Sequence, residues 1–324
     1  MDDLWLSLLA LAGSTIRVVT PLILAALAGL LAERAGVVDI GLEGKMLAAA
    51  FAAAATAAVT GSAWIGLGAG VIVSILFALL HGLASITYKG NQVVSGMALN
   101  ILIAGLAPTL GNAWFHEGGQ TPLLSGNGRF GVIAWPGAEA IGAIPIVGPL
   151  YQQVISGHNI LVYAAVLAVP LVWWLVYRTR FGLRLRAAGE NPHALDTSGV
   201  SVAWVRYRAL LLCGALCGVA GAYLSIAQNA QFIRDMTAGK GFLALAALVF
   251  GKWRPVPTLL ACLLFAFADA LQIRLQGVEL PLIGPIPVQA IQALPYILTV
   301  LLLAGFVGRA IAPRASGIPF VKDR

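Results

Sequence analysis

Long apolar runs alternate with short polar breaks along the whole 324-residue chain. A helix needs about 20 apolar residues to span the hydrocarbon core of a bilayer. Nine stretches come near that length: about 4 to 32, 44 to 60, 62 to 88, 92 to 115, 158 to 178, 203 to 230, 240 to 252, 255 to 276 and 288 to 308. The second and the seventh are short, so we expect broken or irregular helices there. The pattern predicts an all-α, polytopic membrane protein.

The composition supports this prediction. The chain is 60% hydrophobic and only 10% charged, with a mean hydropathy of +0.90, whereas a soluble domain spends about a quarter of its residues on charge. A net charge of +7 would suit nucleic acid, but the basic residues lie in the breaks between apolar segments and form no basic face with interleaved aromatics. We therefore expect membrane lipid around the chain and no nucleic-acid partner.

Neither the N-terminus nor the cysteines indicate a further function. Asp2 and Asp3 stand where a signal peptide would carry basic residues, so we expect the first apolar segment to remain in the mature protein. Cys213, Cys217 and Cys262 fall within apolar runs and lack other metal ligands at usable spacing, which favours a packing role.

Lysine and arginine gather in particular breaks, and cytoplasmic loops carry an excess of these residues. The break from Arg178 to Arg208 holds six arginines, whereas the Gly- and Pro-rich stretch from His116 to Gly157 holds only Arg129. The first is therefore expected in the cytoplasm and the second outside. Counting outward places the N-terminus outside and these groups inside: Lys89, Lys252, Arg254 and the basic tail. Re-entrant short segments would leave that tail outside, so we favour nine crossings.

The chain also repeats itself weakly. The stretch GKMLAAAFA from Gly44 resembles GKGFLALAA from Gly239, and ALNIL from Ala98 resembles ALPYIL from Ala293 at the same offset. Under the topology above, the two halves are inverted copies. Inverted repeats with short, Gly-interrupted segments at matching positions indicate a substrate pathway near the midplane, because unwound backbone is tolerated there only where it lines a cavity.

Two carboxylates lie where the first apolar segment turns into the short second one. Asp39 and Glu43 occur in AGVVDIGLEGKM, and ionisable groups at membrane depth are costly unless paired or hydrated. Glu33, Arg34 and Lys45 lie close in sequence, and the two basic residues among them could form ion pairs with these carboxylates. Both a structural ion pair and a role in the pathway remain open.

Other polar residues fall inside later segments: His81, Asn100, Asp269, Gln289 and Gln292. Such side chains face the bundle and bond either to neighbouring helices or to a ligand. A lining of amides and aromatics suits a solute with several donors and acceptors, such as a nucleoside or a sugar. A gradient-driven transporter would need a titratable carboxylate, with Asp269 the leading candidate. An intramembrane enzyme would have to use His81, Asp269 and Ser95, whose spacing suggests no nucleophile with its base.

A polar turn interrupts the arginine-rich break. In the stretch GENP, Pro192 disfavours helix at the residue before it, and Gly189 and Asn191 supply turn conformations. Residues from His193 to Gly199 then form a short helix with Pro192 in its first turn. A connection alone would not need such a helix.

These residues resemble a known family. RTRFGLRLRAAGENPHALDTSGVSV, from Arg178 to Val202, resembles the cytoplasmic coupling loop of ABC-importer permeases of the branched-chain amino acid, ribose and nucleoside type. AERAGVVDIGLEGKMLAAAF from Ala32 and TAGKGFLALAALVFGKWRP from Thr237 resemble other motifs of that family. The pattern is most similar to permeases that import nucleosides with a basic membrane lipoprotein. It departs from many of them at Asp39, where they carry Asn, so that position gains no specific role.

The resemblance implies a single permease domain over residues 1–324. Its parts are a first half (1–115), an external loop (116–157), a cytoplasmic coupling loop (179–202), a second half (203–308) and a cytoplasmic tail (309–324). The residues implied for docking the ATPase are Gly189, Glu190, Asn191, Pro192, Ala194 and Gly199. Those expected to border the pathway are Asp39, Glu43, Gly44, Asn100, Thr237, Gly239, Asp269 and Gln292.

The resemblance also implies partners and a substrate. The partners are a cytoplasmic ABC ATPase, a second homologous permease subunit and an extracytoplasmic substrate-binding lipoprotein. The solute is a nucleoside, with branched-chain amino acids or sugars as alternatives. The chain has no phosphate-binding GxxxxGK[ST] motif, and His116 with Glu117 lacks a third metal ligand. We therefore expect no cofactor, no metal and no enzymatic activity in this chain, and a location in the plasma membrane.

Overall fold

A computed structural model describes residues 2–135, 147–275 and 310–322, with isolated positions at 279–280, 284–285, 293, 297 and 300. The long helices are α1 (Asp2–Arg34), α2 (Leu42–Thr60), α3 (Ala63–Gly82), α4 (Gln92–Phe115), α7 (Ile160–Arg178), α10 (Val202–Tyr223) and α12 (Pro255–Leu275). The shorter helices are α6 (Val147–Leu150), α8 (Arg180–Glu190), α9 (Pro192–Thr197) and α11 (Lys240–Phe250). The described residues therefore confirm the all-α prediction.

Four short turns and one small hairpin complete the described elements. The π-helical turns are η1 (Leu83–Thr87), η3 (Tyr151–Ile155) and η4 (Leu224–Gln228), and η2 (Gly126–Gly128) is a 3₁₀ turn. The strands β1 (Glu279–Leu280) and β2 (Gly284–Pro285) pair antiparallel. Since η1 extends α3 and η4 extends α10, both helices reach nearly the lengths predicted from the sequence.

Seven helices of the described residues are long and apolar enough to cross a membrane, and α11 is a shorter apolar helix. The predicted boundaries lie within a few residues of the observed ones, but the predicted count of about nine is only approximate. The ninth predicted segment, residues 288 to 308, lies outside the described residues apart from isolated positions. The sequence did not predict α8, which lies in the arginine-rich break.

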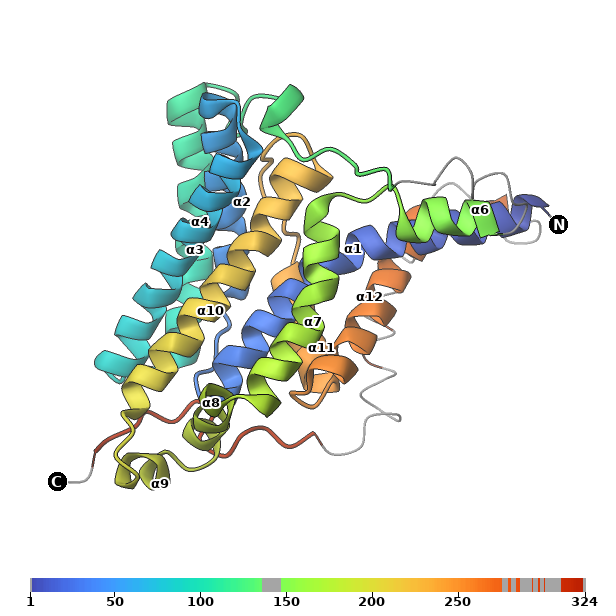
Figure 1. Cartoon of the computed structure of the whole chain (residues 1–324). Helices are drawn as coiled ribbons and strands as arrows, with labels where there is room; N and C mark the ends of the chain where they lie inside the picture. Colours follow the sequence, from blue (N-terminus) through green and yellow to red (C-terminus); the bar gives the residue numbers. More distant parts are fainter. Residues whose placement is uncertain are drawn as a thin grey trace.

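The helices form a central group and an outer group (Figure 1). The most apolar stretch of α1 is 89% buried, and those of α2 and α10 are 72% buried, whereas that of α4 is only 22% buried. Small residues allow the close packing of the central helices. A Cβ placed on Gly221 of α10 would lie 2.0 Å from the carbonyl oxygen of Met46 in α2. The exposed faces of α3, α4, α7 and α12 are apolar enough to face lipid or a partner subunit.

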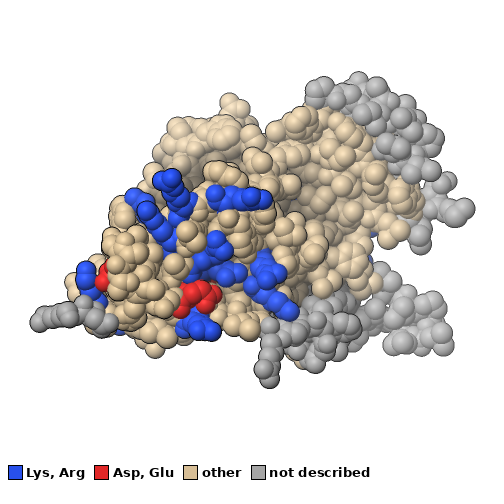
Figure 2. All heavy atoms as spheres, turned by 60° about the horizontal axis from the view of Figure 1, so that its bottom comes forward, with Lys and Arg blue, Asp and Glu red and all other residues tan. Residues whose placement is uncertain are grey.

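The basic segments share one end of the bundle. The chain reaches this end at the C-termini of α1, α7 and α11, and α8, α9 and the C-terminal residues 310–322 lie there too, at the bottom of Figure 1. Lysine and arginine side chains gather on this end face (Figure 2). The start of α1 lies away from the basic end, at the right of Figure 1. The structure thus brings the basic breaks together as predicted, and we call this face the basic end.

Candidate translocation and coupling sites

Helix α2 begins inside the bundle rather than at its end. After α1, residues 35–41 run without helix as a connector into the bundle. The side chain of Asn100 in α4 then accepts a hydrogen bond from Gly44 N (2.8 Å) and donates one to the Ile40 carbonyl (3.0 Å). Asn100 is eight residues from the start of α4, which is about 12 Å along that helix. The predicted pathway residues Gly44 and Asn100 therefore lie together at the start of α2.

Helix α11 begins at the same place from the other half of the chain. The carboxylate of Glu43 accepts hydrogen bonds from Gly239 N (2.8 Å) and from Gly241 N (2.6 Å). The free N–H groups at a helix start carry partial positive charge, so a carboxylate is favourable there. We call this contact between Glu43 and the start of α11 the crossing. From it, α2 runs away from the basic end and α11 runs toward it (Figure 1).

The backbone that leads into α11 has an unusual conformation. Asp235, Ala238 and Gly239 have φ values of 52°, 46° and 79°, in the left-handed region that costs energy for residues other than glycine. Thr237 is buried, and its carbonyl oxygen accepts a hydrogen bond from Lys240 N (2.9 Å). The surrounding fold therefore fixes this turn tightly.

Asp39 belongs to a buried ion pair. Its carboxylate contacts Lys45 Nζ, and both side chains are fully buried. The thiol of Cys213 in α10 donates a further hydrogen bond to the same carboxylate (3.4 Å). A buried charge pair survives only with good geometry and additional hydrogen bonds. Of the two hypotheses for Asp39, the structure provides the contacts of a structural ion pair, with Lys45 as partner.

Side chains from α3 and α4 hold the connector. The ring of His81 lies 3.1 Å from the Val38 carbonyl oxygen and 3.0 Å from Ser95 Oγ, and Gln92 accepts a hydrogen bond from Val38 N (2.7 Å). The spacing gave no reason to pair His81 with Ser95, but the tight turn between α3 and α4 brings them together. His81 thus ties α3 to the connector, and Gln92 ties α4 to it.

The FGKWRP motif anchors the turn between α11 and α12. Trp253, which is buried, donates its indole N–H to the Glu33 carboxylate. Arg34 Nε donates to the Trp253 carbonyl (2.9 Å). Glu33 and Arg34 therefore bind Trp253 rather than Asp39 or Glu43. The end of α11 is thereby joined to the end of α1.

Asp39 belongs to the buried ion pair and Thr237 to the turn before α11. The last two predicted pathway residues, Asp269 and Gln292, are not assigned to the crossing either. Asp269 lies half-buried in α12, which packs on α1, α7 and α11. Gln292 lies outside the described residues, as does Gln289. Among the described residues, the crossing thus gathers Glu43, Gly44, Asn100 and Gly239.

The coupling loop forms two helices at the basic end. The buried face of α8 contains Gly182, Leu185, Ala188 and Gly189. Helix α9 begins at Pro192 as predicted, and the Asn191 side chain caps it by accepting from Ala194 N (3.1 Å). Glu190, Asn191, Ala194 and Gly199 are exposed and Pro192 is half-buried. Only Gly189 is buried, because it packs on the end of α1: a Cβ there would lie 2.3 Å from the Arg34 carbonyl oxygen.

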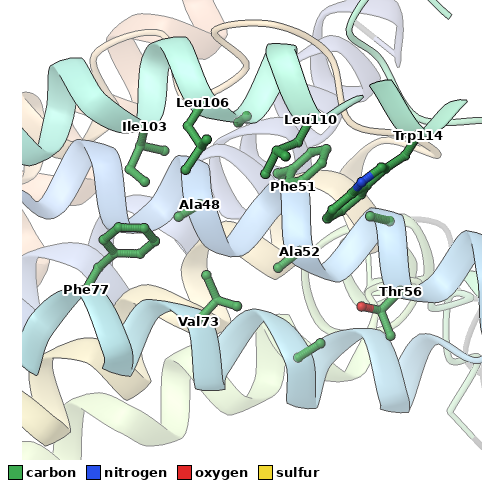
Figure 3. A pocket seen from close by; sticks show the side chains of 13 residues that line it. Ala48, Phe51, Ala52, Thr56, Val73, Phe77, Ile103, Leu106, Leu110 and Trp114 are labelled. Carbon is green, nitrogen blue, oxygen red and sulfur yellow. The ribbon is translucent and has the colours of Figure 1, made fainter. Parts of the chain in front are cut away.

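A separate cavity of about 260 Å³ lies between α2, α3 and α4 (Figure 3). Its lining side chains are apolar except for the Thr56 hydroxyl and the indole nitrogen of Trp114. Phe51 stacks on Trp114 with ring centroids 5.6 Å apart. A solute with several hydrogen-bonding groups would find few partners here, so the crossing is the better candidate for a polar pathway.

Comparison with known proteins decides the family. A family model described as the permease component of branched-chain amino acid transport systems matches residues 11–307. The chain belongs to this permease family. No solved structure matches it.

Three relatives support the same assignment. The permease is 36% identical to the nucleoside ABC transporter permease protein NupC of Lactococcus lactis, over 94% of each chain. It is 36% identical to the guanosine ABC transporter permease protein NupQ of Bacillus subtilis, over 96% of each chain. It is 38% identical to the putative glucose ABC transporter permease protein TsgC13 of Haloferax volcanii, over 84% of this chain and 79% of the relative.

Sequence reasoning missed several contacts of the permease. The role of Trp253 required knowing that α11 ends beside α1. Arg206 of α10 is 1% exposed and donates to the Ala35 carbonyl (3.1 Å) and the Ile318 carbonyl (3.2 Å), yet it had been counted only as a topology signal. Its place four residues into an apolar helix was the signal that could have set it apart from the exposed arginines.

Proposed function

We propose that this chain is the membrane-spanning permease subunit of an ABC importer and that it passes nucleosides into the cytoplasm. Two observations support the substrate class: NupC and NupQ, which match nearly end to end, are named for nucleosides and guanosine. The chain itself hydrolyses no ATP, and the energy comes from a partner ATPase. The observation that carries the transport mechanism is the crossing, where two helices from opposite halves of the chain begin inside the bundle.

The second permease subunit is a homologue of this chain rather than a copy of it. Three organisms each hold two matching permeases with unequal identity. The less similar members are NupB of Lactococcus lactis (23% identical), NupP of Bacillus subtilis (28%) and TsgB13 of Haloferax volcanii (27%). The exposed apolar faces of the outer helices leave room for such a partner. A substrate-binding lipoprotein delivers the solute from the other side of the membrane.

The basic end faces the cytoplasm in this proposal. Lysine and arginine gather there, in agreement with the excess of these residues in cytoplasmic loops. The N-terminus then lies outside, and residues 189–199 of the coupling loop meet the ATPase together with the tail. The exposed residues Glu190, Asn191, Ala194 and Gly199, together with Pro192 and the buried Gly189, form the docking piece.

A continuous series of contacts leads from the coupling loop to the crossing. Gly189 packs directly on Arg34 at the end of α1, and the connector 35–41 begins there. Movement of α8 and α9 would therefore shift the connector, which leads straight into Glu43 and the crossing. Packed helices move between discrete arrangements rather than deforming continuously. Closure of the ATPase would thus rearrange the crossing, and Asp39, Thr237 and Gly239 would border the pathway as it opens.

Uptake by a reconstituted importer tests the proposal. The four components are this chain, its second permease, the ATPase and the binding protein, placed in proteoliposomes with ATP inside. We expect ATP-dependent accumulation of radiolabelled guanosine or uridine, and little competition from excess leucine or glucose. If only glucose competed, the proposed substrate would be a sugar rather than a nucleoside, in keeping with the similarity to TsgC13. Uptake by this chain without the ATPase, driven by a proton gradient and lost in Asp269→Asn, would instead show a secondary transporter.

A further inference from the structure

The C-terminal residues 310–322, which we call the tail, pack against the coupling loop. Ala315 N donates to the Gly189 carbonyl (2.8 Å), and Gly317 N donates to the Gly36 carbonyl (3.3 Å). Arg206 also holds the Ile318 carbonyl, as described above. The tail is therefore fixed to the end of α1, to α8 and to α10 at once.

The far end of the tail contacts α9 itself. The ring of Phe320 lies 5.3 Å from the ring of His193, edge to face. Lys322 Nζ lies 3.7 Å from the Asp196 carboxylate, with the lysine side chain 74% exposed. Phe320 also packs on the small apolar cluster formed by α8, α9 and the start of α10. The tail thus extends the exposed surface of α9.

A groove of about 410 Å³ lies between the tail, α9, the start of α10 and the turn before α4. Its lining includes apolar side chains, among them Phe320, Val200 and Ile86. Lys322 and Lys89 also line the groove, and Lys89 has a left-handed turn conformation with φ of 55°. Gly199, which belongs to the predicted docking piece, also lines this groove.

We propose that this groove is a second docking site for the ATPase subunit and takes an acidic segment of that subunit. The inference rests on the proposed function, because it requires an ATPase at the basic end. A partner that covers α9 would meet the groove without a gap, since Gly199 belongs to both. The apolar part of the lining suits buried side chains of a protein segment, and the two lysines suit its carboxylates. The two lysines would also suit an anionic lipid headgroup, so the test below compares membranes with and without anionic lipid.

Charge reversal tests this docking site in the assembled transporter. The permease pair is placed in nanodiscs of phosphatidylcholine, and the affinity of the purified ATPase is measured with and without added phosphatidylglycerol. The test variant is Lys89→Glu with Lys322→Glu. The matched control, Arg180→Glu with Arg184→Glu, makes the same charge change on exposed residues of α8 outside the groove. Lys89→Arg with Lys322→Arg retains the charge.

We expect the groove reversal to weaken ATPase binding about tenfold or more, the α8 reversal to weaken it less than about threefold, and the arginine variant to bind normally. The wild-type affinity should also fall more steeply with salt than that of the groove variant. Equal effects of the two reversals, or no effect of either, would overturn the docking site. So would a loss seen only with phosphatidylglycerol, which would assign the groove to lipid. A wild-type permease that binds no ATPase would refute the proposed function itself.

Discussion

Glu43 in α2 accepts a hydrogen bond of 2.8 Å from the backbone N–H of Gly239, 196 residues further along the chain. With the second bond from Gly241, this carboxylate joins the starts of two helices that run in opposite directions. The start of α2, in the first half of the chain, is therefore bonded to the start of α11, in the second half. A rearrangement of the crossing must break or replace these two bonds.

Glu43→Gln tests the importance of the crossing. Glutamine has nearly the same shape but only one acceptor oxygen, so its amide nitrogen would face a backbone N–H donor. Hydrogen bonds to a charged group contribute about 1.5–3 kcal/mol each. We expect uptake by the reconstituted importer to fall about tenfold or more while insertion is retained. Glu117→Gln, in an exposed position, is the control, and equal uptake by the two variants would show that the crossing is not needed for transport.

The ion pair of Asp39 and Lys45 predicts strong coupling between the two residues. Asp39→Asn or Lys45→Met alone leaves a buried charge without its partner, which typically costs about 3–5 kcal/mol. The double variant removes both charges, so we expect it to regain most of the lost thermal stability in detergent. A double-mutant cycle of apparent Tm values measures this. Additive losses would mean that the two side chains do not depend on each other.

The sequence predicted the helices and the two short segments because their cause is local, although α2 and α11 are regular helices rather than broken ones. Apolar length places a helix in a membrane, and glycine interrupts it, so the starts of α2 and α11 could be found from Gly44 and Gly239. The contact between them could not, because it depends on how the halves pack. The repeat gave only the hint that these two positions correspond.

Helix α8 shows what the local pattern left undetected. Gly182, Leu185 and Ala188 are three residues apart and form its buried face, a spacing that predicts a helix. The surrounding arginines obscured it, because they were interpreted as orientation signals only. Two nearby cations, Arg34 and Lys45, could pair with Asp39 by their place in the sequence, and only the packed structure selects Lys45.

The coupling loop predicts separate effects on insertion and on transport. Glu190 is exposed and Asn191 caps α9, so Asn191→Trp removes a helix cap as well as changing the surface, whereas Glu190→Arg changes the surface alone. We expect both variants to insert normally and to lose uptake, and Arg184→Gln to reduce insertion only modestly. Immunoblots of membrane fractions beside uptake assays measure the two properties. Normal uptake in Glu190→Arg would remove the turn between α8 and α9 from the docking surface.

The packing of α10 on α2 predicts opposite outcomes for two glycine substitutions. A Cβ at Gly221 would lie 2.0 Å from the Met46 carbonyl oxygen, whereas a Cβ at Gly68 in α3 has no neighbour within 4 Å. Gly221→Ala must push α10 and α2 apart, which costs about 1–3 kcal/mol or more. Gly68→Ala gains helix propensity, about 1 kcal/mol. We therefore expect a lower apparent Tm for Gly221→Ala and an unchanged or higher one for Gly68→Ala.

Because α2 carries Glu43, a shift of α2 would also move the crossing, so uptake by the surviving Gly221→Ala protein should fall as well. If each folded Gly221→Ala molecule kept full uptake, transport would not depend on how α2 packs against α10.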